Sequence, residues 1–211
     1  MKIAVVSESP ADEAAIKILV DAIVGSETEM FALRARPNGW PHVLNLLPNL
    51  VIGLHYGTDV EALVAVVDSD ESPIHHNSHA ALQEENPQCR LCQLRSTIGL
   101  ALTRVRAVPN RASVKTAMGL AVPTIEAWYR CGLDPHVNEA TWVRSLRGER
   151  IIYDKRSLKI AVYGTHQPSL VVETETAVLA ADRLADNIQL LEQLFPIGFG
   201  CLLLDICSWS G

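Results

Sequence analysis

One apolar stretch limits the folds open to this chain. Residues 62–67 read Ala-Leu-Val-Ala-Val-Val and run directly into Asp68-Ser69-Asp70. A short, nearly continuous apolar run is typical of a strand buried on both faces, as in a parallel sheet covered by helices. Acidic residues have no packing reason to end such a strand, because burying them costs several kcal/mol, roughly, without a partner or a metal. The stretch therefore predicts both a central strand and a site at its carboxyl end. An acidic turn that caps the next helix would have the same sequence pattern.

The surrounding sequence alternates between strand and helix patterns. Strands are expected over 2–7, 29–34, 62–68 and 114–122, and helices over 10–24, 42–56, 87–105, 124–132, 155–163 and 174–195, with another short helix opening at Asp134-Pro135. Ser9-Pro10 followed by acids has the signature of a helix start, and Gly25 that of a helix end. We expect an α/β fold with a Rossmann-like, mainly parallel sheet flanked by helices. Residues 1–132 would form this core, and residues 133–211 a helical elaboration, with the apolar tail at 197–209 docked on it.

Composition narrows the functional classes. The chain has 211 residues, 48% of them hydrophobic and 20% charged, which indicates a folded protein with a substantial core. Its net charge of −6 gives no general attraction to nucleic acid, so such a contact would need a local basic patch or a metal. No apolar run is long enough to span a membrane, so we expect no membrane partner. Five cysteines without a disulfide spacing favour a cytoplasmic protein.

Acids follow three of the expected strands. Glu8 follows the first, Asp68 and Asp70 the third, and Glu126 the fourth. Adjacent parallel strands bring their carboxyl ends to one edge, so these side chains are expected to meet. Several carboxylates in one place repel one another unless a cation is present, and Mg²⁺ takes carboxylate and water ligands. The pattern indicates a site for Mg²⁺ or Mn²⁺.

These motifs resemble the TOPRIM family, and most closely its OLD-nuclease and RloB-like members from bacterial defence loci. The first motif of OLD-like proteins, Glu-Gly-Pro-x-Glu, is similar to residues 8–12 here, which read Glu-Ser-Pro-Ala-Asp, with Ser9 in place of Gly. Asp68 and Asp70 match the metal-binding pair, and Pro123-x-x-Glu126-x-Trp128 resembles a later motif. The resemblance covers about the first 130 residues. It implies a TOPRIM-like fold and a Mg²⁺-dependent nuclease, primase or topoisomerase reaction on nucleic acid, in phage defence or DNA maintenance.

The resemblance also suggests residue roles. Glu8 would be a general base or a ligand, Asp68, Asp70 and Glu126 would hold metal, and Asp12 matches the family's second acid. Lys155 or Lys159 could balance phosphate charge, although exposed lysines are commonly only solvated. The chain has no Walker motif, so any ATPase would be a separate partner. Two rival functions stay open, a nucleotide-sugar transferase that uses Asp-x-Asp, and a non-enzymatic subunit that keeps an acidic pocket.

A second group of residues has metal-ligand chemistry. His75, His76 and His79 precede Cys89 and Cys92, and two Cys with two His could hold Zn²⁺. The histidine spacing fits no standard zinc finger, and cysteines three apart on a helix pack equally well in a core, so zinc is not the favoured interpretation. The histidines, His75 first among them, could instead line the acidic site. The arginines between Arg90 and Arg111 could form a strip for a polynucleotide, but a solvated helix face is favoured.

Overall fold

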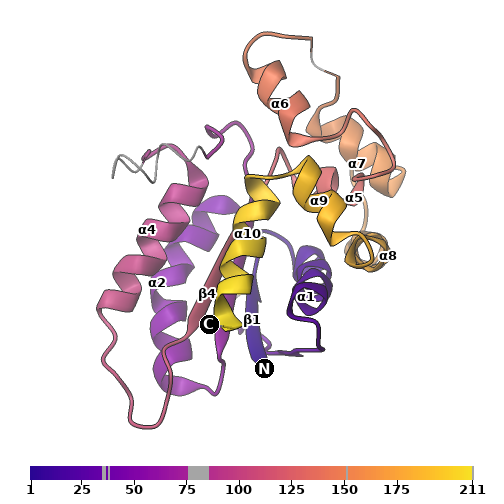
Figure 1. The fold of residues 1–211 in the computed structure, drawn as a ribbon. Helices are drawn as coiled ribbons and strands as arrows, with labels where there is room; N and C mark the ends of the chain where they lie inside the picture. The colour runs from indigo at the N-terminus through magenta and orange to yellow at the C-terminus, as the bar shows by residue number, and fades with distance from the viewer. Residues whose placement is uncertain (35–36, 38, 76–85, 151, 211) are drawn as a thin grey trace.

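Four parallel strands form the centre of the protein. The computed structural model describes residues 1–34, 37, 39–75, 86–150 and 152–210. The sheet has the order β2–β1–β3–β4, with every pair parallel (Figure 1). Its strands are β1 (Lys2–Val6), β2 (Glu29–Met30), β3 (Ala62–Asp68) and β4 (Lys115–Ala121). The predicted α/β class and the Rossmann-like parallel arrangement are confirmed.

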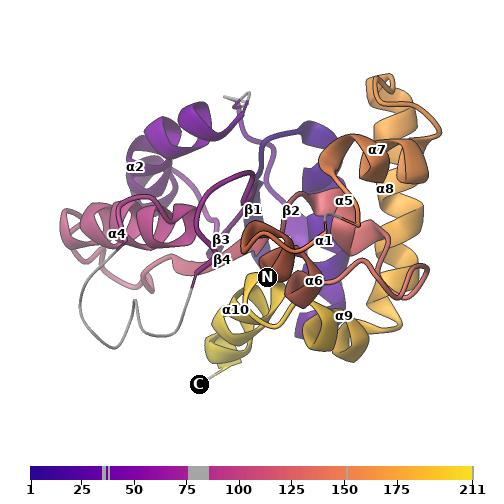
Figure 2. The ribbon, with the colours of Figure 1, turned by 90° about the horizontal axis from the view of Figure 1, so that it is seen from above.

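Helices cover both faces of the sheet, as Figures 1 and 2 show. On one face lie α2 (Trp40–Gly57) and α4 (Arg90–Thr103), and on the other lie α1 (Pro10–Val24) and α10 (Gly198–Cys207), with α8 (Leu170–Ala185) packed against α1. Side chains of β3 alternate between the two layers, with Leu63 and Ala65 toward the first and Val64 and Val66 toward the second. All four are at most 2% exposed, which explains why this strand is apolar throughout.

Helix α1 begins and ends at the residues that the sequence predicts. Ser9 Oγ accepts a hydrogen bond from the backbone N–H of Ala11 at 3.3 Å, Pro10 is the first residue of the helix, and Gly25 ends it with φ +76°. The predicted strand at 29–34 is wrong beyond its first residues. Only Glu29–Met30 pairs regularly at the sheet edge, and Phe31 N–H donates one further bond, to Ile3 O at 2.7 Å.

The second half is helical, with smaller elements between the large ones. They are α5 (Ile125–Tyr129), α6 (Glu139–Leu146), α7 (Lys155–Tyr163), α9 (Ile188–Leu194) and a 3₁₀ turn, η1 (Ser208–Ser210). The boundaries predicted for α7 are confirmed. The single helix predicted over 174–195 is wrong, because the chain forms α8 and α9 around a break. At the break Asn187 has φ −136° and ψ 38°, and its carbonyl accepts the first hydrogen bonds of α9, from Leu190 and Leu191.

The C-terminal helices share the core of the first half. Buried side chains of α8, α9 and α10 lie in one apolar cluster with β1, β3 and α1, and this cluster includes Trp128 and Phe199. Helix α10 crosses β4 at very short range, because a Cβ on Gly198 would stand only 2.0 Å from Leu120 O. The absence of a side chain at residue 198 permits this contact.

Helix α10 and η1 also cover the outer edge of β4. Asp205 accepts a hydrogen bond from the backbone N–H of Met118 at 3.0 Å, and the Trp209 indole donates to Thr116 O at 3.3 Å. Side chains thus satisfy backbone groups that another strand would otherwise pair. None of the helices in the described part of the chain combines the length and the apolarity that crossing a membrane needs.

Candidate functional site

The acidic residues lie where the direction of strand order reverses. The chain passes from β1 outward to β2 and then returns to place β3 on the other side of β1. In open α/β sheets the crevice at such a reversal, outside the carboxyl ends of the strands, is where ligands bind. Glu8 follows β1 and Asp68 ends β3, so both stand at this point, which faces the viewer of Figure 2.

Glu8 and Asp68 are joined directly. The Glu8 carboxylate accepts a hydrogen bond from the backbone N–H of Asp68 at 3.1 Å. The Asp68 side chain accepts one from the backbone N–H of Ile125 at 3.0 Å, so the acid at the end of β3 also holds the start of α5. The structure therefore brings the ends of β1, β3 and β4 together, with both a helix-capping and a site-forming role for Asp68.

Asp70 occupies a tight turn between two cations. Its φ of +50° is in the left-handed region, which Asp tolerates better than most residues, and its N–H donates to Pro123 O at 3.1 Å. The carboxylate accepts from the guanidinium of Arg90 at 2.5 Å and forms an ion pair with the Lys155 ammonium. The same guanidinium contacts Glu8 at 3.4 Å and donates to Asp68 O at 2.7 Å. Glu8 and Asp70 thus lie on either side of one side chain.

Glu126 and Asp12 extend the cluster toward α1 and α7. Glu126 is only 4% exposed, one of its oxygens lies 3.7 Å from Lys159 Nζ, and the other, Oε2, has no hydrogen-bond partner among the described residues. Asp12 accepts a hydrogen bond from the Tyr129 hydroxyl at 3.2 Å. A buried carboxylate oxygen without a partner is unusual, and a role in binding an ion or ligand is one physical reason for it.

Burial and neighbouring charges shift the pKa values of Asp68, Asp12 and Lys155. Burial, followed by the charges of Glu126, Glu8 and Asp12, raises the pKa of Asp68 well above its ordinary value. Burial and the Glu126 charge raise the pKa of Asp12 to about 8. Burial lowers the pKa of Lys155, against the opposing pull of Asp68 and Glu8. The Asp12 and Asp68 carboxylates are therefore held in the charged form only at a cost that a cation would offset.

The charge balance and donor chemistry of the cluster fit a divalent cation. Five carboxylates (Glu8, Asp12, Asp68, Asp70 and Glu126) gather with three cationic side chains (Arg90, Lys155 and Lys159). Carboxylate oxygens are the hard ligands that Mg²⁺ prefers, and the unpartnered oxygen of Glu126 is available. Asp70 differs from the others because both its oxygens already have cationic partners.

Arg90 is the site residue that the sequence reasoning placed wrongly. It was expected on a solvated helix face, yet its side chain is 14% exposed and lies in the acidic cluster, with the guanidinium 5.1 Å from the ring centre of Trp40. The position of Arg90 could have indicated its role, because it is the first residue of α4 and a cation at a helix N-terminus is unfavourable for the helix dipole. Such a position indicates an anionic partner nearby. Arg111 instead donates to the carbonyls of Leu54 and Val60, so these arginines serve different regions.

His75 packs beside two cysteines, apart from the carboxylates of the acidic cluster. The structure brings His75 to Cys89 and Cys92, and His76 and His79 lie outside the described residues.

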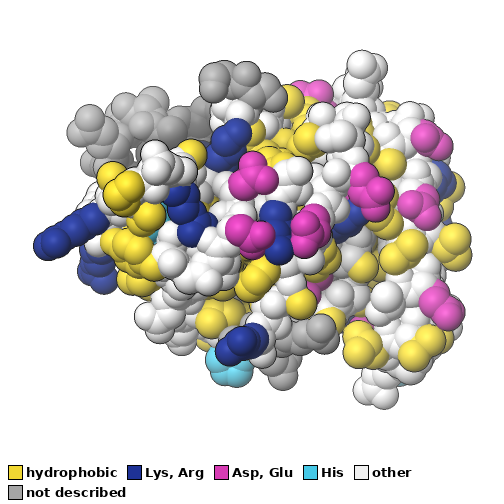
Figure 3. Space-filling model, turned by 90° about the horizontal axis from the view of Figure 1, so that it is seen from below, with side chains coloured by type: hydrophobic (Ala, Val, Ile, Leu, Met, Phe, Trp, Pro, Cys, Tyr) yellow, Lys and Arg dark blue, Asp and Glu magenta, His cyan; other side chains and the backbone are white. Residues whose placement is uncertain are grey.

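The opposite end of the sheet, at the amino ends of the strands, shows acidic and basic side chains intermixed in Figure 3. There Lys2 forms ion pairs with Glu29 at 3.0 Å and Asp59 at 3.1 Å. The intermixed charges on that face offer no continuous basic surface to a polynucleotide.

Comparisons of this chain with protein-family models, with curated proteins and with solved structures found no match.

Proposed function

We propose that the protein is a Mg²⁺-dependent phosphoryl-transfer enzyme, a nuclease that hydrolyses phosphodiester bonds of DNA or RNA. One observation carries the proposal: at the strand-order reversal, a surplus of carboxylates surrounds Arg90, which joins the ends of β1 and β3, and Lys155, which pairs with Asp70. Carboxylates suit Mg²⁺, and guanidinium and ammonium groups suit phosphate oxygens. A site for a metal-bound phosphodiester needs both kinds of group.

Each residue has a role that follows from its position. Glu8, Asp68, Asp70 and Glu126 would hold the metal, which when bound polarises a phosphoryl oxygen and stabilises the leaving oxygen. Arg90 can present two N–H groups to a phosphate, and Lys155, 38% exposed, can follow a substrate as a point charge. Glu8 is placed to accept a proton from an attacking water. Asp12 and Tyr129 support the cluster from α1 and α5.

The resemblance to TOPRIM proteins supports the same activity. The residues that carry it, Glu8, Asp68, Asp70 and Glu126, are the carboxylates that surround the cations here. The family's place in bacterial defence and its nucleic-acid substrates belong to this proposal as well. So do a cytoplasmic location, inferred from the cysteines, and a separate ATPase partner, inferred from the lack of a Walker motif.

Mn²⁺ binding and cleavage assays test the proposal together. We expect the wild-type protein to bind Mn²⁺ and to cleave a labelled single-stranded or double-stranded DNA or RNA. Asp68→Asn should reduce cleavage to background, and Glu126→Gln should weaken Mn²⁺ binding about tenfold or more, equivalent to about 1.4 kcal/mol. Asp182→Asn, on the exposed face of α8, is the matched control and should change neither property.

Each rival function has its own result. Metal-dependent turnover of a nucleotide sugar, without cleavage of any nucleic acid, would identify a transferase. Mn²⁺ binding with no activity until a partner protein is added would identify a subunit. Absence of Mn²⁺ binding by the wild-type protein at millimolar concentrations would refute the metal site itself, and with it the proposed chemistry.

A further inference from the structure

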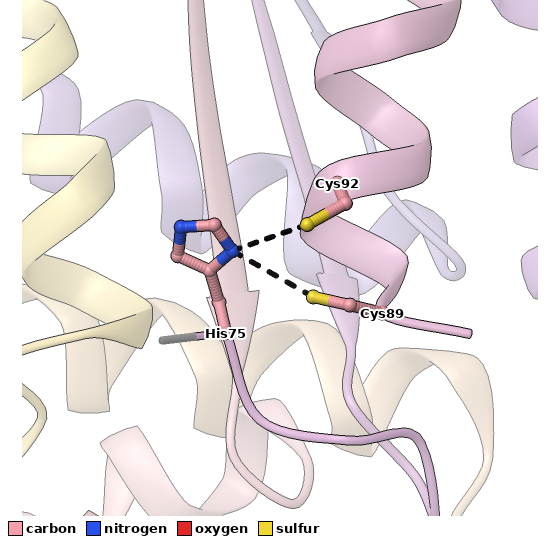
Figure 4. A group of neighbouring side chains, drawn as sticks. All are labelled: His75, Cys89 and Cys92. Atoms are coloured by element: carbon pink, nitrogen blue, oxygen red, sulfur yellow. Dashed lines mark hydrogen bonds between the residues drawn. The ribbon is translucent and has the colours of Figure 1, made fainter. Parts of the chain in front are cut away.

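A second cluster of metal-ligating side chains lies where the segment after β3 meets the first turn of α4. His75 comes from the segment after β3, Cys89 immediately precedes α4, and Cys92 lies in its first turn (Figure 4). The three residues are 3%, 0% and 5% exposed, respectively. One atom from each lies within 4.8 Å of the other two. Both sulfurs face the same ring nitrogen, His75 Nδ1.

The spacing of these atoms matches a tetrahedral zinc site. With Zn–S near 2.3 Å and Zn–N near 2.0–2.1 Å, tetrahedral geometry places a sulfur about 3.6 Å from a nitrogen bound to the same ion. The measured distances from His75 Nδ1 are 3.7 Å to Cys89 Sγ and 3.4 Å to Cys92 Sγ. Both sulfurs, from residues of one segment, therefore already stand at the distance from the imidazole nitrogen of another segment that one shared ion would impose.

Hydrogen bonding alone accounts poorly for this arrangement. Nδ1 of an imidazole has either one lone pair or one hydrogen, so it can form one well-directed hydrogen bond. Here it faces two sulfurs at similar distances. Thiols are also weak hydrogen-bonding groups, so the pair of contacts would stabilise the cluster little. A cation at the centre would satisfy all three atoms at once.

The local sequence suits such a site. Cys-x-x-Cys is the ligand spacing of many zinc sites. Cys89 immediately precedes α4 and Cys92 lies in its first turn, so one short stretch of backbone carries both thiols. Imidazole with two thiolates favours a thiophilic metal over Mg²⁺, which prefers oxygen ligands. The donor set thus separates this cluster chemically from the acidic one.

We propose that His75, Cys89 and Cys92 bind one Zn²⁺ ion, with a water molecule or another donor in the fourth position. The ion would fasten the segment after β3 to the first turn of α4. Arg90 lies between the two cysteines and reaches Glu8 and Asp70 from that turn. The zinc site would therefore hold the arginine of the acidic cluster in place, whatever reaction that cluster performs.

Cobalt substitution tests the proposal without an activity assay. Metal-free, reduced wild-type protein titrated with Co²⁺ should bind one equivalent that gives the visible bands of tetrahedral Co²⁺ and a near-ultraviolet thiolate charge-transfer band, and Zn²⁺ should displace it. Any Co²⁺ held by the carboxylates of the acidic cluster would show no thiolate band and is counted separately. Cys89→Ser and Cys92→Ser should each weaken binding at least about a hundredfold, because even residues beyond the ligands commonly account for ten- to a hundredfold. Cys131→Ser is the control, since that thiol is equally buried and lies outside the cluster.

The wild-type titration decides the matter even if the Ser variants fail to fold. One equivalent of Co²⁺ with a thiolate band supports the site, and zinc found in the protein as purified supports it further. Lack of Co²⁺ binding, or binding without a thiolate band, overturns it. Unchanged affinity in folded Cys89→Ser and Cys92→Ser also overturns it, as does an intact mass showing that the native pair forms a disulfide in reducing buffer.

Discussion

Replacing Asp12 by Asn should remove a measurable pH dependence of stability. The pKa of Asp12 is about 8 in the folded protein, because of burial and the Glu126 charge, against about 3.9 in an unfolded chain. The folded protein therefore binds a proton that the unfolded chain releases, and stability falls as the pH rises from about 4 to about 8. Asn keeps the size of the side chain and an oxygen that accepts from Tyr129, but does not titrate.

The magnitude follows from the same pKa difference. Across most of this range each pH unit lowers the free energy of unfolding by about 1.4 kcal/mol, so the full effect between pH 5 and pH 7 is about 2.7 kcal/mol. The Asp12 side chain keeps some contact with solvent, which screens its charge and brings the expectation to about 1–2 kcal/mol.

Urea unfolding followed by circular dichroism measures this effect. Without divalent metal, the stability of Asp12→Asn relative to wild type should rise by about 1–2 kcal/mol between pH 5 and pH 7. The exposed Asp182→Asn serves as the control, because its difference from wild type should stay constant with pH. A constant difference between Asp12→Asn and wild type would refute the crowding of charge inferred at this site.

Two further substitutions test the packing of α10 by thermal and urea unfolding. Gly198→Ala should destabilise the protein by about 1–3 kcal/mol, because its Cβ would stand 2.0 Å from Leu120 O. The control is Gly53→Ala, whose Cβ meets nothing within 4 Å and which should stabilise α2 by about 0.5–1 kcal/mol. Equal effects of the two substitutions on stability would contradict the close contact between α10 and β4. Glu139→Gln should lower the free energy of unfolding by about 1–3 kcal/mol. The carboxylate accepts hydrogen bonds from the N–H groups of Ile197 and Gly198 at 2.8 and 3.1 Å, whereas an amide has only one acceptor oxygen. Unchanged stability would show that water can replace the lost hydrogen bond, and would contradict this expectation.

The central strand was predictable because its signal is local. Residues 62–68 are apolar without a break, and only a strand covered on both faces requires that pattern. The helix break at Asn187 was not predictable in the same way. Apolar residues keep a helical spacing on both sides of it, and only the packing of Leu191 and Phe195 into the core selects two helices over one.

The acidic site was predictable in its anions and, as one of two open interpretations, in Lys155 and Lys159, but not in Arg90. Parallel strands place whatever follows them at one edge, so the approach of Glu8 to Asp68 follows from topology. Arg90 and Lys155 arrive from helices remote in sequence, and their long side chains can reach solvent or the site equally well. His75 likewise needed the three-dimensional path of the segment after β3 before its pairing with Cys89 and Cys92 was visible.

The covering of β4 by α10 has a consequence for the order of events during synthesis. Translation completes β4 long before α10, so a nascent chain can assemble most of the sheet while the backbone groups of Thr116 and Met118 at its edge still lack Trp209 and Asp205. An open strand edge invites pairing with another chain. Ribosome-bound chains stalled before residue 198 should therefore depend on chaperones more strongly than chains stalled far enough downstream for α10 to have left the exit tunnel.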